Sequence, residues 1–463
     1  MENRTLQFVA DACAGELWRG KVDAPVGRVC TDSRHAQAGD LFFAIKGDRF
    51  DGHDFLHEVA SKKVAAVVIS RDRRSSKLPD CGVIGVDDAR ASLGLFAAAY
   101  RAEFNLPVIA VGGSNGKTTT KELIAAVLRQ KLVTLWSEAS FNNDIGVPLT
   151  LLRIERNHDV AVLEVGTNHP GEIAPLARMI QPQFGVITNI GREHLEFFGD
   201  EAGVAAEEGS LAEQLPSGGK LFLNGDSEWS VRIGDRTKAR VIRVGTGEAN
   251  DWRAIEVNVE RKGVVFRVVS HHSEFDGEYH IHLLGRHQVV NALFAVALGA
   301  ELGLSRAEIQ QGLAECKSSK MRLQMSEING VTVLDDTYNA NADSMLAALR
   351  VLQELPGNGR RLAVLGDMAE LGAQSESAHA EVGRCAAELG VGQLFTVGEM
   401  ARAMATSARA AGLARVMEFP DVDAAVGAMK SFVKPGDVVL LKASRAARLE
   451  RLADALRAEP TEK

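Results

Sequence analysis

The chain has 463 residues, of which 46% are hydrophobic and 25% charged, a composition typical of globular proteins. At about 150 residues per domain, this length predicts roughly three domains. The net charge is −8, whereas nucleic-acid-binding proteins usually carry a basic surface, so no nucleic-acid partner is expected.

The first segment, 1–103, is predicted to form a small α/β domain. Apolar runs at 65–70 and 82–86 are typical of buried strands, and a helical pattern follows at 89–104.

The second segment, 104–319, is predicted to be a central ATP-binding domain. Strand-like runs at 106–112, 160–166 and 185–190 alternate with helical stretches, which favours a parallel sheet with its site at the carboxyl ends of the strands. Between about 241 and 284 apolar and polar residues alternate instead, which predicts an antiparallel addition to that sheet.

The third segment, 320–463, is predicted to be a Rossmann-like, doubly wound domain. Its expected strands, at 331–334, 361–365, 393–397, 415–419 and 437–441, are separated by alanine-rich helices. No repeat or low-complexity linker occurs, so the chain is predicted to be a three-domain α/β protein whose domains are joined by short hinges.

The start of the chain lacks a basic stretch followed by an apolar one, and no long uncharged apolar run occurs. We therefore expect no membrane span and a cytoplasmic location. The cysteines, Cys13, Cys30, Cys81, Cys316 and Cys385, lack CxxC spacing, which favours reduced core residues over disulfides or a metal site.

A phosphate-binding loop is predicted where the sequence GGSNGKTTT, at 112–120, follows an apolar strand and precedes a helical run. Glycines let the backbone wrap an anion, and a helix start directs free N–H groups towards it. Position 111 is valine, so only the short pattern GxxGK followed by threonine fits. The alternative is a glycine turn that precedes a helix by chance. The residues expected to bind ATP here are Gly113, Ser114, Asn115, Gly116, Lys117, Thr118 and Thr119, with Thr118 also on Mg²⁺.

Two further polar residues follow predicted strands. Glu164 ends one apolar run and His194 lies just past another, so both are predicted to face the phosphate loop as magnesium ligands. The alternative for an isolated loop histidine is an ordinary hydrogen-bonding role.

Further motifs recur along the chain in a fixed order. They are SFNNDIGVPLTLL at 140–152, LEVGTNHPGEI at 163–173, TNIGREHLEFFG at 188–199, GRHQVVNALFAVA at 285–297, LDDTYNANADSM at 334–345, LGDMAELG at 365–372 and LKASR at 441–445. With the short phosphate loop, their order and spacing resemble the Mur ligases over nearly the whole length.

The resemblance implies an ATP-dependent ligase of peptidoglycan synthesis. Its expected substrates are UDP-N-acetylmuramoyl-tripeptide and D-alanyl-D-alanine. ATP would phosphorylate the tripeptide carboxylate, and the dipeptide amine would attack the acyl phosphate to form an amide and phosphate. Such a site must neutralise a carboxylate and a triphosphate that repel each other.

The resemblance also assigns roles to single residues. Lys117 would bind the β- and γ-phosphates, and Glu164 and His194 would hold Mg²⁺ between phosphate and carboxylate. Asn291 would contact the adenine, and Arg322 and Asp336 would reach ATP from the C-terminal domain. The family pattern GxHNxxN has Gln288 at its first asparagine here, which keeps the amide but lengthens the side chain.

One departure concerns the metal site. Mur ligases commonly carry a carbamylated lysine that aligns with Glu208 here. Since Mg²⁺ requires anionic oxygen rather than lysine as such, we expect Glu208 to supply it directly. The alternative is a helix-surface glutamate beside Glu207.

The resemblance places the other substrate contacts at both ends of the chain. The expected contacts to the UDP-linked substrate are Ser33, Arg34, Lys46, Gly47, Asp51, His53, Asn142, Asn143, Thr167, Asn168 and His169. The expected dipeptide contacts are Tyr338, Asn339, Asn341, Lys442, Ser444 and Arg445. Asparagines cap turns very often, so a structural role is the alternative for these groups.

Three other functions compete with this one. MurE shares the N-terminal signature, but its DNPR stretch is absent here. Folylpolyglutamate synthase shares the short loop but lacks a uridine-binding domain. A nucleotide-binding scaffold without catalysis would explain the missing lysine, although Lys117, Glu164 and His194 are retained. We expect a monomer; the diamino acid at peptide position three stays open.

Overall fold

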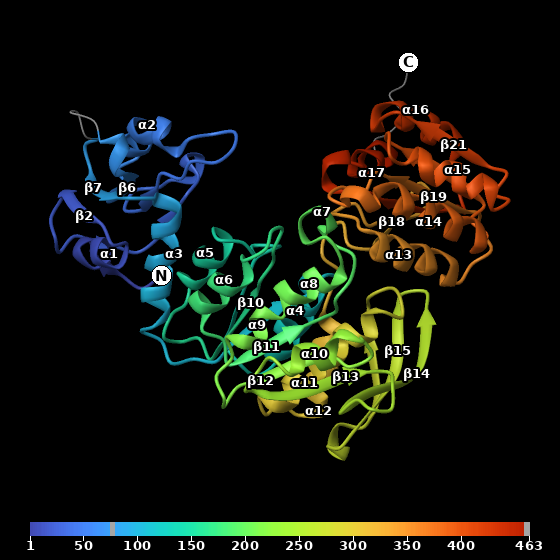
Figure 1. The fold of residues 1–463 in the computed structure, drawn as a ribbon, viewed down its shortest axis with the longest axis horizontal. Coiled ribbons are helices and arrows are strands. Elements are labelled where there is room, and N and C mark those ends of the chain that lie inside the picture. Colours follow the sequence, from blue (N-terminus) through green and yellow to red (C-terminus); the bar gives the residue numbers. More distant parts are fainter. Residues whose placement is uncertain (75–78, 458–463) are drawn as a thin grey trace.

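The computed structural model describes residues 1–74 and 79–457. Its three large sheets follow one another along an elongated molecule, with the first and last sheets on either side of the central one (Figure 1). No helix within these residues is long and apolar enough to cross a membrane. The predicted three-part α/β architecture is therefore confirmed, while the boundaries at 103 and 319 stay predictions.

The N-terminal sheet has the strand order β2-β7-β6-β5-β4. Its strands are β2 (Glu16–Arg19), β4 (Val29–Cys30), β5 (Leu41–Phe43), β6 (Ala66–Ser70) and β7 (Gly82–Val86). Strands β4 to β7 are parallel, and β2 is antiparallel to β7. Alternate residues of β6 face opposite cores, with α1 (Leu6–Ala12) and α3 (Ala89–Arg101) on one face and α2 (Leu56–Ser61) on the other.

The central sheet has nine strands in the order β16-β15-β14-β13-β12-β11-β8-β10-β9. They are β8 (Val108–Gly112), β9 (Thr134–Trp136), β10 (Val160–Glu164), β11 (Phe184–Ile187), β12 (Lys220–Asn224), β13 (Arg240–Gly245), β14 (Trp252–Glu260), β15 (Gly263–Ser270) and β16 (Gly277–Ile281). The antiparallel addition is confirmed for β14 to β16. For β13 the prediction was wrong. This strand is parallel to β12, because α10 (Trp229–Gly234) lies in the crossover between them.

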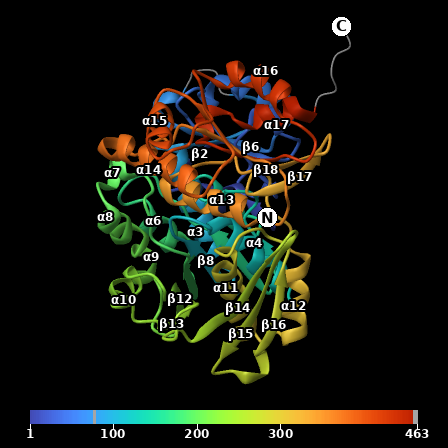
Figure 2. The same ribbon diagram turned by 90° about the vertical axis from the view of Figure 1, so that its right-hand side faces the viewer.

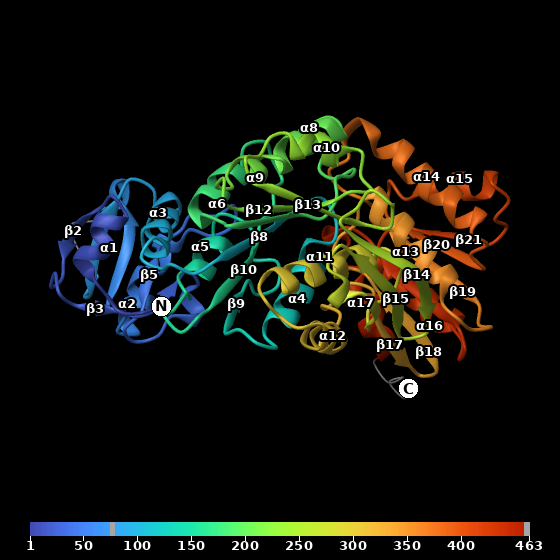
Figure 3. The same cartoon turned by 90° about the horizontal axis from the view of Figure 1, so that it is seen from below.

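Helices cover both faces of the central sheet (Figure 3). On one face lie α4 (Lys117–Leu128), α11 (Gln288–Glu301) and α12 (Arg306–Glu315). On the other lie α5 (Gly146–Leu151), α6 (Ile173–Ile180) and α9 (Ser210–Glu213). Because the sheet is buried on both faces, its inner strands are continuous apolar runs, as in β8.

The C-terminal sheet has the order β17-β18-β22-β19-β20-β21 and lies above the central sheet in Figure 2. Its strands are β17 (Gln324–Ile328), β18 (Val331–Asp335), β19 (Arg361–Gly366), β20 (Gln393–Val397), β21 (Val416–Phe419) and β22 (Val438–Lys442). One face packs on α13 (Ala342–Glu354), α14 (Ser375–Glu388) and α15 (Arg402–Ala410), and the other on α16 (Val422–Phe432) and α17 (Glu450–Arg457). The doubly wound prediction is confirmed, except that the sequence did not predict β17, an antiparallel edge strand.

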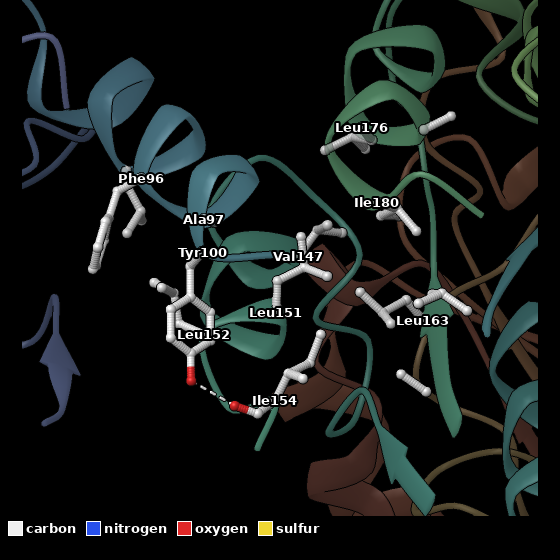
Figure 4. Packing of buried hydrophobic residues seen from close by; sticks show 14 of the residues in the cluster. Phe96, Ala97, Tyr100, Val147, Leu151, Leu152, Ile154, Leu163, Leu176 and Ile180 are labelled. Carbon is white, nitrogen blue, oxygen red and sulfur yellow. Dashed lines mark hydrogen bonds between the residues drawn. The ribbon is translucent and has the colours of Figure 1, made fainter. Parts of the chain in front are cut away.

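The N-terminal and central sheets share one hydrophobic core. Helix α3 contacts α5 and α6; its Phe96 stacks on Phe43 of β5, whereas its Tyr100 points towards Ile154, which follows α5 (Figure 4). The Tyr100 hydroxyl is buried there; it donates to the Ile154 carbonyl at 2.6 Å and accepts from the Glu2 N–H at 2.8 Å. A packed helix therefore joins these two parts of the chain.

We expect Tyr100→Phe to destabilise the junction by about 1–2 kcal/mol, because one buried and one partly buried backbone group lose their partner while the ring packing stays. The fall should be visible as a lower midpoint of thermal unfolding. An unchanged midpoint would show that water replaces the hydroxyl at no cost.

Candidate active site

A cavity of about 910 Å³ lies between the carboxyl ends of the central strands and the C-terminal domain. Most of the predicted site residues line it. They are Ser114, Asn115, Gly116, Lys117, Thr118, Thr119, Asn142, Asn143, Glu164, Thr167, Asn168, His169, His194, Asn291, Arg322, Asp336, Tyr338, Asn339, Asn341 and Lys442. Residues far apart in the sequence thus face one space.

The predicted phosphate loop connects β8 directly to α4, and two of its glycines have left-handed backbone angles. Gly113 has φ 112° and Gly116 has φ 84°. A side chain at Gly113 would collide with Thr188, and one at Gly116 with Asn291. Both positions require glycine for conformation and for space.

The segment after β11 (188–199) fixes the shape of the phosphate loop. The Ser114 N–H donates to the Asn189 carbonyl at 2.9 Å, and the Asn115 N–H donates to Asn189 Oδ1 at 2.8 Å. The Thr188 hydroxyl donates to the Asn115 carbonyl at 2.6 Å. No side chain caps α4, so its first N–H groups face the cavity as an anion site.

Lys117 folds back over this loop. Its Nζ donates to the Gly113 carbonyl at 2.5 Å and lies 3.4 Å from Glu193 Oε2. Burial by itself would lower the pKa of Lys117, but Glu193, Glu208 and Glu164 raise it on balance. The lysine therefore stays charged among buried carboxylates.

Glu208 lies behind the phosphate loop and does not line the cavity. Its side chain is fully buried, and Oε2 accepts from the Gly113 N–H at 2.7 Å. Burial raises the pKa of Glu208 to about 8; Lys117 opposes the rise and Glu193 adds to it. Because Glu208 is buried, the alternative of a glutamate on the helix surface is wrong. The neighbouring Glu207 is buried as well and accepts from two backbone N–H groups.

Three buried carboxylates near Lys117 each keep one oxygen without a hydrogen-bond partner: Glu164 Oε2, Glu193 Oε1 and Glu208 Oε1. Among residues 1–74 and 79–457, no three carboxylate, imidazole or thiolate groups converge closely enough to hold a metal by themselves. Mg²⁺ usually takes one or two carboxylates together with substrate phosphates and water, so the free oxygens of Glu164 and Glu193, which line the cavity, fit a site shared with a bound nucleotide.

His194 contacts the C-terminal domain. Its Nδ1 lies 2.5 Å from Glu370 Oε2, and its side chain is largely buried. His194 therefore connects the central and C-terminal domains at the cavity.

The predicted C-terminal residues divide into two groups. Arg322 lies over the Tyr338 ring and donates to the Ser140 hydroxyl at 3.3 Å, and Lys442 donates to Asp336 Oδ2 at 2.6 Å. These residues line the cavity, as do Asn339 and Asn341. Ser444 and Arg445 do not: the Ser444 hydroxyl accepts from the Ala369 N–H, and Arg445 pairs with Glu450.

The predicted N-terminal contacts are not among the residues that line the cavity. They are Ser33, Arg34, Lys46, Gly47, Asp51 and His53. Arg34 pairs with Asp32, and Asp51 contacts His53 at 2.6 Å and Arg73 at 2.6 Å. Two residues that the sequence did not predict, Asp48 and Arg90, reach the cavity from this domain instead.

Sequence reasoning also missed residues that join the domains at the cavity. Arg192 pairs with Asp343 at 2.7 Å and with Glu381 at 2.6 Å. Glu193, Asp343 and Glu370 line the cavity. Except for Glu381, each of these residues lies inside a motif quoted above, but only the fold shows which of them meet.

Comparison with known proteins gives one family for the whole chain. Family models match at residues 25–101 (Mur ligase family, catalytic domain), 111–299 (Mur ligase middle domain) and 321–445 (Mur ligase, glutamate ligase domain). The UDP-N-acetylmuramoyl-tripeptide--D-alanyl-D-alanine ligase of Escherichia coli K12 is 38% identical, with 99% of each chain covered. The Bacillus subtilis enzyme of the same name is 35% identical, with 98% of each covered.

Solved structures agree with the sequence relatives. A crystal structure of MurF from Acinetobacter baumannii superimposes with a TM-score of 0.90 at 31% identity, covering 99% of this chain and 100% of the other. MurF from Thermotoga maritima in complex with ADP gives a TM-score of 0.80 at 26% identity, covering 93% and 97%.

We expect Glu208→Gln to raise the thermal stability of the ligand-free protein near pH 8. The folded state raises the pKa of this carboxyl from 4.5 to about 8, so the parent protein loses stability as pH rises between those values. The gain should be about 1–3 kcal/mol at pH 8 and should vanish towards pH 4.5. Unfolding midpoints across that range measure it; a gain that does not depend on pH would contradict the buried charge.

Proposed function

The chain belongs to the Mur ligase family, and from this premise we propose that it uses ATP to join D-alanyl-D-alanine to UDP-N-acetylmuramoyl-tripeptide. The product is the UDP-muramoyl-pentapeptide precursor of peptidoglycan. Full-length relatives at 35–38% identity carry this activity in their names. The observation that carries the proposal is the 910 Å³ cavity, which brings an anion-binding helix start together with polar residues of the C-terminal domain.

ATP binds with its phosphates at the start of α4. The free N–H groups there and the ammonium of Lys117 neutralise phosphate charge. Asn291 borders the loop and donates to Gln288 at 2.8 Å. A second cavity of about 230 Å³ is lined by Leu283, Leu284, Gln288 and Arg322 among others, and we assign it to the adenine.

The proposed reaction has two steps. A carboxylate oxygen of the tripeptide attacks the γ-phosphorus, and the bond to ADP breaks. The dipeptide amine then attacks the acyl carbon, loses a proton and displaces phosphate. The chain's contribution is to hold like-charged groups in line: Lys117 and Arg322 supply positive charge from two domains.

Magnesium completes the charge balance. The residues that would hold it are Thr118 at the start of α4, Glu164 through its unpartnered Oε2, and His194. Bound there with ATP, the ion would draw charge from the γ-phosphate towards the substrate carboxylate.

Glu208 takes the place of the family's lysine. Its Oε1 has no hydrogen-bond partner and lies near Lys117, so with Mg²⁺ and ATP bound it would supply negative charge without CO₂, in line with the expected replacement. Because Oε2 is bonded to Gly113, a role in shaping the phosphate loop accompanies any role at the metal.

The substrates enter from opposite sides of the cavity. Asn142, Thr167, Asn168 and His169 face it from the central domain, so the muramoyl peptide lies along them, with its uridine end towards Asp48 and Arg90. The N-terminal contacts predicted from the sequence, Ser33, Arg34, Lys46, Gly47, Asp51 and His53, remain a proposal for the uridine end. The dipeptide lies by Tyr338, Asn339 and Asn341.

We expect phosphate release from ATP to require both UDP-muramoyl-tripeptide and D-alanyl-D-alanine. Omitting either substrate should remove the signal in a coupled phosphate assay, because the acyl phosphate forms on one substrate and is consumed by the other. Lys117→Ala should lower the rate at least about 100-fold, since a charge that stabilises the transferring phosphoryl group is lost. ATP binding without phosphate release would support the scaffold alternative instead.

We expect activity to persist in buffer purged of CO₂ and bicarbonate, because the Glu208 carboxylate needs no carbamylation. Glu208→Gln should abolish most acyl-phosphate formation under the same conditions. A strict bicarbonate requirement in the parent enzyme, or near-normal rates in the variant, would refute this role.

A further inference from the structure

Glu370 stands out because it meets a proposed magnesium ligand from another domain. It follows β19 in the C-terminal domain, and its Oε2 lies 2.5 Å from Nδ1 of His194, which follows β11 in the central domain. Both residues line the large cavity.

The backbone at both residues is unusual. His194 has φ 49° and Glu370 has φ 61°, a left-handed conformation that is uncommon for residues other than glycine. The Glu196 N–H donates to the Glu370 carbonyl at 3.0 Å, so main chain as well as side chain joins the two segments. Strained backbone that surrounding contacts hold in place is found most often at functional sites.

The orientation of the imidazole has a chemical consequence. With Nδ1–H donated to a carboxylate, the lone pair lies on Nε2, the form in which histidine binds metals. Metal-binding histidines usually donate their other N–H to such a partner, which fixes the ring and raises its basicity.

We propose that Glu370 is a positioning residue that orients His194 towards the magnesium bound with ATP, so that the metal site is complete only when the C-terminal domain is docked. The inference rests on the proposed function in taking His194 as a magnesium ligand. It adds that a residue of one domain controls a metal ligand of another.

Neighbouring contacts hold the same interface without touching the His194 side chain. Arg192 pairs with Asp343 and Glu381, and Gln374 Nε2 donates to the Gly199 carbonyl at 3.2 Å. The Glu370 side chain is 42% exposed, so its contact with His194 adds little stability by itself. Removing the Glu370 side chain is therefore expected to change metal binding rather than stability. Gln374, which contacts the same interface without touching the His194 side chain, provides a matched control.

The test measures Mn²⁺ affinity by titration calorimetry, with a non-hydrolysable ATP analogue bound and no other substrate. We expect Glu370→Ala to weaken Mn²⁺ binding about tenfold, the range for a lost partner of a metal-binding histidine. Glu370→Gln should keep most of the affinity, because its amide oxygen still accepts from Nδ1. Gln374→Ala, which disturbs the same interface, should leave the affinity unchanged.

A double-mutant cycle separates positioning from general damage. In a His194→Ala background, Glu370→Ala should cause no further loss of Mn²⁺ affinity. Equal losses from Glu370→Ala and Gln374→Ala, or additive losses with His194→Ala, would overturn the proposal.

The outcome is distinguishable from a failure of the proposed function, because this titration uses neither UDP-muramoyl-tripeptide nor D-alanyl-D-alanine. In the phosphate-release assay, Glu370→Ala should need about tenfold more Mg²⁺ for half-maximal rate and recover near-parental kcat at saturating Mg²⁺. A lower kcat with unchanged Mg²⁺ dependence would also overturn it.

Discussion

The site depends on the hydrogen bonds that hold the phosphate loop against the segment after β11. Asn189 accepts from the N–H groups of Ser114 and Asn115, and Thr188 donates back to the loop. These bonds pair the N–H groups of the loop, whereas no side chain caps α4, whose first N–H groups face the cavity. The same segment continues to Arg192 and His194, which contact the C-terminal domain. One stretch of chain thus shapes the nucleotide site and docks the domain opposite it.

Charge sets the second constraint. Glu164, Glu193 and Glu208 are buried around a single lysine, and each keeps an unpartnered oxygen. A buried carboxylate without a partner is costly, so this arrangement favours cations at the site. Glu208 is tied to the phosphate loop as well, because its Oε2 accepts from the Gly113 N–H.

The sequence predicted the strands, loop and helix of the site better than it predicted which strands pair and which side chains meet. The strand, loop and helix around Lys117 are recognisable because each has a local signal: an apolar run, glycines and a helical pattern. β13 and β17 were mistaken or missed because strand direction and edge pairing depend on neighbours distant in the chain. In the N-terminal domain, Asp51 and His53 have polar side chains of the kind that bind substrates, yet they contact each other. Nothing in the local sequence distinguishes a substrate contact from a contact within the domain.

The sequence by itself determined the α/β fold class, the family and the phosphate loop, since these follow from periodicity and from motifs that need only neighbouring residues. The tertiary structure decided which side chains meet: that Glu208 is buried behind the loop, that Arg90 reaches the cavity, and that Glu370 holds His194. The physical reason is that hydrogen bonds and charge interactions act over a few ångströms in space. Residues 194 and 370 come within that range only after two domains have folded and docked.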